Sequence, residues 1–101
     1  MSTMYISEYS NAGFTPQGVV PVGAEPCTDQ SPVSFTGTAG VSAAFQNNTR
    51  MVRVHVDGIA SIAFGTAPSA TTNNKRMVAG ATEYFFVPQG SAYKVSAITN
   101  S

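Results

Sequence analysis

The chain holds one histidine and one cysteine, the side chains best suited to acid–base or nucleophilic chemistry near neutral pH. His55 has no second histidine or cysteine as a metal-binding partner along its segment. A serine–histidine–aspartate triad has no support beyond the presence of the residue types, because no nucleophile-elbow motif occurs. Cys27 lies between Glu25 and Asp29, an acidic setting that disfavours the reactive thiolate. We therefore expect no enzyme, no catalytic, cofactor-binding or metal-binding residue, and no functional need for Cys27 or His55.

The five carboxylates give no clear sign of a catalytic site either. They are Glu8, Glu25, Asp29, Asp57 and Glu83. Glycoside hydrolysis needs two carboxyl groups facing each other across a cleft, and no pair stands out. Asp57 fits a turn, while Glu8 and Glu83 fall within expected strands. If either of these two glutamates is covered, the expected partner is an arginine such as Arg50, Arg53 or Arg76, in the same subunit or a neighbouring one.

The composition favours strands over helices. The chain of 101 residues has no Leu and no Trp, but it has eleven Val and eleven Thr. Val and Thr are stiff at χ1 and fit a pleated sheet, whereas Leu is a strong helix former. Only 10% of the residues are charged and the net charge is zero, which favours association and argues against nucleic-acid binding. No apolar run is long enough for a membrane-spanning helix, so we expect no membrane partner, and no secretory signal is visible.

The second half of the chain reads as a series of short strands and turns. Residues 50–56 alternate, with Val52, Val54 and Val56 on one face and Met51, Arg53 and His55 on the other. Asp57-Gly58 and Pro88-Gln89-Gly90 are turn signals that predict two hairpins. Further strands are expected at residues 4–9, 33–36, 59–64, 76–78, 83–87 and 92–98. Residues 19–22 are expected at an edge or as an irregular segment, 41–45 as a strand or helical turn, and 11–18, 23–30 and 66–75 as loops.

These elements predict one all-β domain over residues 1–101. We expect an antiparallel β-sandwich or barrel-like roll of six to eight short strands. The predicted core consists of several alanines together with Ile6, Val52, Val54, Val56, Ile62, Phe64, Phe85, Val87 and Val95.

The aromatic residues at 84–86 suggest a surface for assembly. Tyr84 and Phe86 share one face of their strand and Phe85 occupies the other, so both faces should be covered, one by the core and one by a neighbouring surface. A sugar platform on these rings is the alternative, weakened by the lack of Trp. Residues 1–9 are a candidate docking arm or edge strand, and an integral strand is the alternative that the sequence leaves open. The predicted interface residues are Met4, Tyr5, Ile6, Glu83, Tyr84, Phe85 and Phe86.

Several segments together suggest a family. Residues 4–9, 50–55, 61–66, 76–79 and 83–90 resemble small proteins encoded among the virion genes of tailed bacteriophages. The resemblance implies a virion structural protein and, within that class, a capsid decoration or cement protein that stabilises the head. It implies a major capsid or other virion protein as partner, a homo-oligomer or many copies on a lattice, and synthesis in the host bacterial cytoplasm. It supplies no active-site residue. The alternative is a carbohydrate- or receptor-binding module on a phage tail or fibre.

Overall fold

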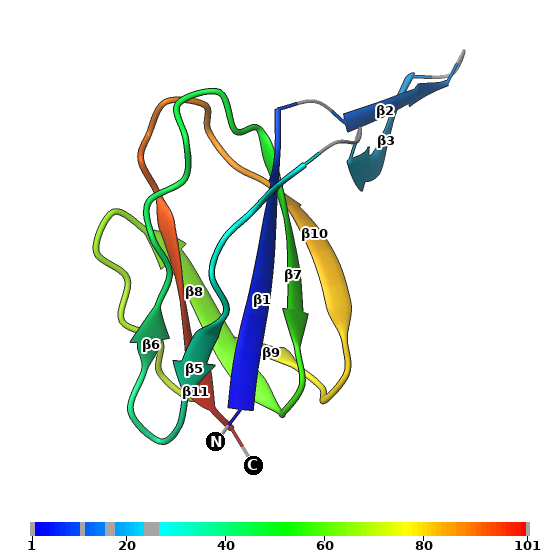
Figure 1. Cartoon of the computed structure of the whole chain (residues 1–101). Helices are drawn as coiled ribbons and strands as arrows, with labels where there is room; N and C mark the ends of the chain where they lie inside the picture. The colour runs from blue at the N-terminus through cyan, green and yellow to red at the C-terminus, as the bar shows by residue number, and fades with distance from the viewer. Residues whose placement is uncertain (1, 11, 16–17, 24–26, 101) are drawn as a thin grey trace.

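The computed structural model describes residues 2–10, 12–15, 18–23 and 27–100, and every regular element in these ranges is a strand (Figure 1). The strands are β1 (Ser2–Tyr9), β2 (Ala12–Thr15), β3 (Gly18–Gly23), β4 (Thr28–Asp29), β5 (Val33–Phe35), β6 (Gly40–Val41), β7 (Met51–Val56), β8 (Ala60–Gly65), β9 (Lys75–Met77), β10 (Thr82–Phe86) and β11 (Lys94–Thr99).

The strands form two main antiparallel sheets and a separate two-stranded ribbon. The five-stranded sheet has the order β10-β7-β1-β4, and β5 also pairs with β1. The four-stranded sheet has the order β6-β11-β8-β9, and β2 pairs with β3. Figure 1 shows the two main sheets facing each other, with the β2–β3 ribbon at one end. The predicted all-β sandwich is confirmed, with more strands than expected because several two- and three-residue segments also pair.

β1 is a central strand, so Ser2–Tyr9 is an integral strand, which the sequence left open, and the docking arm or edge strand is wrong for these residues. One side of β1 pairs with β7 along its length, from Met4 opposite Val56 to Tyr9 opposite Met51. Its other side pairs with β5 near its start and with β4 near its end. Alternation places Met4 and Ile6 on the core face, where both are buried. Burial of this face explains why the segment is built into the sheet.

The two predicted hairpins are also wrong, although both turns exist. β7 and β8 belong to different sheets, and so do β10 and β11, so each turn carries the chain from one sheet to the other. The alternation of apolar and polar residues cannot distinguish a hairpin within one sheet from a crossing between two sheets. In both cases the apolar face of each strand points towards the same core. The Asp57 turn is tied to β1: Asp57 N donates to Thr3 O at 3.2 Å, and Thr3 N donates to Asp57 Oδ1 at 2.6 Å.

Gly58 is needed for space rather than for a positive φ. A Cβ atom at Gly58 would overlap the Ser2 side chain, and Gly58 has no φ in the left-handed region. In the other turn, Gly90 does adopt a φ of 76°.

One hydrophobic core lies between the two main sheets. Of the predicted members, Ile6, Val52, Val54, Val56, Ile62 and Val95 are buried, and Ala60, Ala70 and Ala97 are the buried alanines. Phe64, Phe85 and Val87 are half-buried and pack against this core. The sequence prediction lacks four large members of the cluster, which are Met4, Phe35, Phe45 and Met77.

The irregular segments differ from expectation in detail. The predicted loops at 11–18 and 23–30 contain β2 and β4, and the edge segment at 19–22 lies within β3. Of the ambiguous residues 41–45, only Val41 belongs to a strand, β6. Residues 71–74 are exposed as predicted, and Ala70 holds their loop to β11 because its N–H donates to Ser96 Oγ at 3.0 Å.

Candidate binding face

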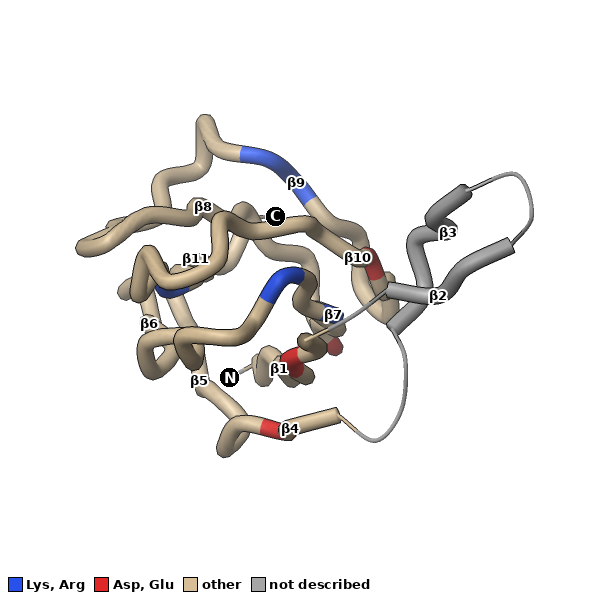
Figure 2. The backbone as a smooth tube through the Cα atoms, turned by 90° about the horizontal axis from the view of Figure 1, so that it is seen from above, with Lys and Arg blue, Asp and Glu red and all other residues tan. Residues whose placement is uncertain are grey.

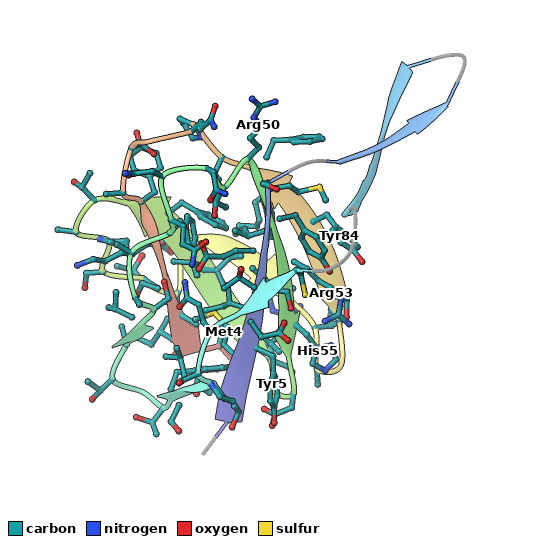
Figure 3. All side chains as sticks on the ribbon, turned by 45° about the horizontal axis from the view of Figure 1, so that its top comes forward. Met4, Tyr5, Arg50, Arg53, His55 and Tyr84 are labelled. Atoms are coloured by element: carbon teal, nitrogen blue, oxygen red, sulfur yellow. The ribbon has the colours of Figure 1, made fainter. Side chains whose placement is uncertain are left out.

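The five-stranded sheet turns one face away from the core, and this outer face is the candidate functional site. Its register aligns Tyr5 with His55 and Thr82, and Ser7 with Arg53 and Tyr84. We define the outer face by the side chains of Tyr5, Ser7, Arg53, His55, Tyr84 and Phe86, which alternate with the core residues of β1, β7 and β10. Figure 3 shows Tyr5, Arg53, His55 and Tyr84 on these adjoining strands.

Aromatic rings dominate the exposed surface of the outer face. Tyr5 is 44% exposed, Tyr84 36% and Phe86 61%. The Tyr5 and His55 rings lie 6.0 Å apart, and His55 Nδ1 is hydrogen-bonded to Thr82 Oγ1 at 2.7 Å. Cross-strand contacts of this kind hold the rings in place on a regular sheet. The rings therefore form a preorganised contact surface.

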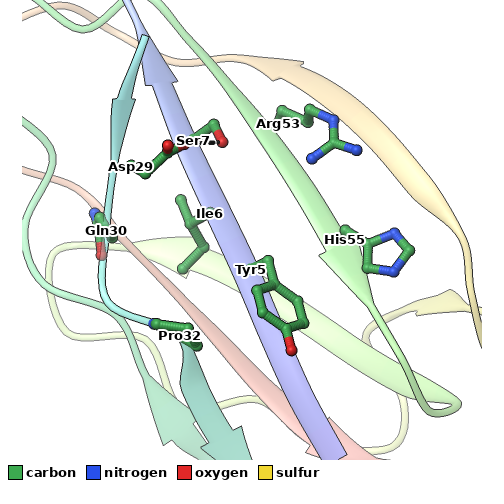
Figure 4. A pocket seen from close by; sticks show the side chains of 8 residues that line it. All are labelled: Tyr5, Ile6, Ser7, Asp29, Gln30, Pro32, Arg53 and His55. Atoms are coloured by element: carbon green, nitrogen blue, oxygen red, sulfur yellow. Dashed lines mark hydrogen bonds between the residues drawn. The ribbon is translucent and has the colours of Figure 1, made fainter.

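A shallow depression of about 530 Å³ lies beside Tyr5 (Figure 4). Its lining residues are Tyr5, Ile6, Ser7, Asp29, Gln30, Pro32, Arg53 and His55. Within it, Ser7 Oγ donates to Asp29 Oδ1 at 2.6 Å, and Cys27 Sγ donates to the same oxygen at 3.3 Å. These hydrogen bonds from Ser7 and Cys27, with a smaller contribution from the charge of Arg53, lower the pKa of Asp29 below its usual value. Asp29 therefore stays ionised and fixed in position.

Arg53 is the available cation of the outer face. Its side chain is half-buried, yet its guanidinium makes no hydrogen bond or close ion pair with another residue in the described ranges. Asp29 acts on it only through longer-range attraction. A guanidinium with free N–H groups is suited to a carboxylate or a backbone carbonyl. The depression thus combines a flat ring, a cation that has no partner among the described residues, and a fixed carboxylate.

One end of the outer face is covered. Met51, expected beside Arg53 and His55, points to that side but is fully buried, because it packs with Tyr9 and Cys27. The Tyr9 ring also lies 6.3 Å from the Tyr84 ring. Cys27 therefore has a packing role next to its hydrogen bond to Asp29.

The two strand glutamates have different surroundings, and the expected arginine partner of Glu8 is wrong. Glu8 is buried, and its carboxylate accepts hydrogen bonds from neutral donors: Gln30 Nε2 at 2.9 Å, Gln46 N at 2.8 Å and Thr49 Oγ1 at 2.7 Å. Glu83 is exposed. Three neutral donors thus satisfy the hydrogen-bonding capacity of the buried Glu8 carboxylate without a cation. Glu25 lies outside the described residues.

The predicted interface residues fall into two groups, because alternate residues of a strand lie on opposite faces of the sheet. Met4 and Ile6 are buried in the core, and the Phe85 ring points inward, 5.0 Å from the ring of Phe64. Tyr5, Tyr84 and Phe86 belong to the outer face, and Glu83 is exposed at the margin of the sheet. A partner protein that binds the folded chain can contact the outer-face residues and Glu83, but it cannot contact Met4 or Ile6.

Within the described ranges, no three side chains of His, Cys, Asp or Glu come together as metal ligands. The same part of the chain has no helix long and apolar enough to cross a membrane.

No protein-family model, curated protein or solved structure matches this chain. Any ligand or partner of the outer face must therefore be inferred from its own side chains.

Proposed function

We propose that the chain is a structural protein of a tailed-bacteriophage virion, a capsid decoration or cement protein that docks on the capsid through the outer face. The observation that supports this most directly is the group of exposed rings, Tyr5, Tyr84 and Phe86, around Arg53, whose guanidinium has no hydrogen-bond or ion-pair partner among the described residues. Aromatic residues and Arg are enriched at the centres of protein interfaces, where they supply most of the binding energy.

The position of these side chains on regular strands supports a docking role. β10, β7 and β1 are paired along their lengths, and both β7 and β1 have a neighbour on each side. Side chains on such a scaffold lose little freedom when a partner binds, which lowers the entropic cost of association. The low content of charge and the resemblance to virion proteins agree with a subunit that packs in many copies.

Binding to particles that lack the protein tests the proposal. Wild-type protein should co-sediment with such particles, and Phe86→Ser or Tyr84→Ser should reduce the bound fraction severalfold without unfolding the chain. The matched control is Val78→Ser, because Val78 is 57% exposed but lies between β9 and β10, off the outer face. Equal loss for Val78→Ser, or no loss for either outer-face variant, contradicts the proposal.

The depression favours a second candidate, a carbohydrate- or receptor-binding module on a tail or fibre. A ring such as Tyr5 can stack on a sugar, and the nearby Asp29 and Arg53 can bond to hydroxyl or carboxylate groups. Binding of host surface oligosaccharides that is abolished by Tyr5→Ala, together with tail density in cryo-electron microscopy, would favour this alternative over the capsid role.

A further inference from the structure

β10 forms one margin of the five-stranded sheet, and no strand among the described residues pairs with its outward backbone. Val56 N donates to Ala81 O at 3.2 Å, and Val87 N donates to Arg50 O at 2.9 Å, which fixes the residues that face β7. In an antiparallel ladder, every second residue of a strand directs its backbone N–H and C=O groups to the same neighbour. The backbone groups of Glu83 and Phe85 therefore also point towards β7. Thr82, Tyr84 and Phe86 therefore point their N–H and C=O groups away from the sheet. We call this row the free edge of β10.

The free edge of β10 has few of the features that usually prevent edge pairing: Glu83 is its one charged residue, and β3 is a nearby strand that does not pair with it. The strands at the other margins of the two main sheets, β4, β5, β6 and β9, are only two or three residues long. β10 has five residues, no proline and no lysine, and its register with β7 is regular. Monomeric proteins normally interrupt such an edge with these residues, a bulge or a cover. Within the described ranges, no backbone hydrogen bond closes the free edge.

We infer that the free edge of β10 binds a second copy of this chain, strand to strand and antiparallel, with Tyr84 opposite Tyr84 on the two-fold axis. This register places Thr82 of each copy opposite Phe86 of the other. The outward N–H and C=O groups of these residues then face each other as hydrogen-bonded pairs. The two five-stranded sheets become one continuous sheet, and the two outer faces join. The inference goes beyond the proposed capsid role and does not depend on what the outer face binds.

The charges at this margin select a second copy as the occupant. Lys75 of β9 places its ammonium nitrogen 5.7 Å from the centre of the Phe85 ring, and Glu83 lies two residues from Phe85 on the same side of β10. Figure 2 shows the basic segment of β9 near the acidic segment of β10. In the proposed register, Glu83 lies directly opposite the partner's Phe85, in a pair whose side chains approach closely. Its carboxylate therefore comes next to the partner's Lys75, and symmetry repeats the ion pair.

Sedimentation and hydrogen exchange of the isolated full-length protein test the pairing. We expect dimers that dissociate on dilution from millimolar to micromolar concentration. The amides of Thr82, Tyr84 and Phe86 should exchange slowly in the dimer and at least about tenfold faster in the monomer, because only the dimer bonds them. The amides of Glu83 and Phe85 are internal controls that stay protected in both. A monomer throughout this range, or a dimer with fast exchange at the free edge, overturns the inference.

A charge reversal tests the register. Lys75→Glu alone and Glu83→Lys alone should each raise the dimer dissociation constant severalfold, because each places like charges together. The double variant should restore the wild-type constant. Arg76→Glu is the matched control, since Arg76 is an exposed cation on the same strand with the opposite side-chain direction. Failure of the double variant to recover, with all variants folded, overturns the proposed pairing. These measurements need no particles, so their failure leaves the capsid proposal standing.

Discussion

Thr49 Oγ1 donates a hydrogen bond of 2.7 Å to Glu8 Oε1, and both residues are buried although 41 positions separate them. Gln46 N donates to the same oxygen, and Gln30 reaches the other carboxylate oxygen. Gln30 in turn exchanges hydrogen bonds with the backbone of Ala43. The buried carboxylate thus fixes the irregular segment before β7 to the central strand β1.

Replacing Thr49 by valine should weaken the fold while keeping the shape of the side chain. The change removes a buried donor and leaves part of the Glu8 carboxylate unsatisfied, so the free energy of unfolding should fall by about 1–3 kcal/mol. Urea denaturation measures the difference. Thr72→Val is the control, because Thr72 is exposed and should change the value by less than about 0.5 kcal/mol. Similar results for both variants would contradict a structural role of the Glu8 cluster.

Two neighbouring substitutions in β7 should differ sharply in their effect on stability. Val54 is fully buried, so Val54→Asp places an unpaired charge in the core and should cost more than about 3 kcal/mol. His55→Asp puts the same side chain on the outer face, where we expect a loss of about 1 kcal/mol. Thermal unfolding followed by circular dichroism compares them. An unchanged melting temperature for Val54→Asp would reverse the assignment of faces.

Gly40, the first residue of β6, should be harder to replace than Gly37 in the connection from β5 to β6. A Cβ atom at Gly40 would overlap the carbonyl oxygen of Ser34, a backbone atom that cannot rotate away. Gly40→Ala should therefore destabilise the fold by about 1–3 kcal/mol. Gly37→Ala is the matched control, because a Cβ atom added at Gly37 would have nothing within 4 Å. If both variants unfold at the same urea concentration as the wild type, β5 and β6 do not approach as described.

The ionisation of Asp29 should depend on Ser7. The hydrogen bond from Ser7 is the largest cause that lowers the pKa of Asp29, so Ser7→Ala should raise that pKa towards its usual value of 3.8. Because the folded-state pKa is lowered, the contribution of Asp29 to stability is present above about pH 4 and is lost as the pH falls through the folded-state value. Carboxyl-carbon NMR shifts recorded against pH give the midpoint. Ser34→Ala, on β5, should leave it unchanged.

Removal of residues 1–9 should prevent folding rather than merely weaken attachment. The deletion takes away the central strand of the five-stranded sheet and the core side chains of Met4 and Ile6. Loss of dispersion in the NMR spectrum of the truncated protein measures the effect. A truncated chain that folds but no longer binds particles would show that β1 acts as an arm.

The sequence predicts which segments form strands and which of their side chains point towards the core, because the alternation of apolar and polar residues is a local property. The predicted faces of Val52, Val54 and Val56 are correct, since one apolar side and one polar side repeat along the segment. The burial of Met51 escapes prediction because its cover comes from Tyr9 and Cys27, which no local pattern connects to it. The same holds for Glu8, whose partners lie in segments without regular structure.

Strand pairing could not be predicted, because it depends on contacts between distant segments. The sequence locates the turns at Asp57-Gly58 and Pro88-Gln89-Gly90, but a tight turn serves equally to reverse a strand within one sheet or to cross between two. The outer face could be anticipated only in part. Tyr84 and Phe86 stand out in the sequence, whereas their proximity to Arg53 and Tyr5 requires the register of three strands.

The crossing of both turns between sheets has a consequence for folding kinetics. Among the described strands of the two main sheets, only β8 and β9 are both consecutive and paired, while β1 pairs with the distant β7 and β8 with the distant β11. Folding dominated by such distant contacts is slow, in the range of milliseconds to seconds for small all-β domains. A ribosome must release nearly the whole chain before either sheet can close. Any assembly of this protein must therefore begin from completed subunits.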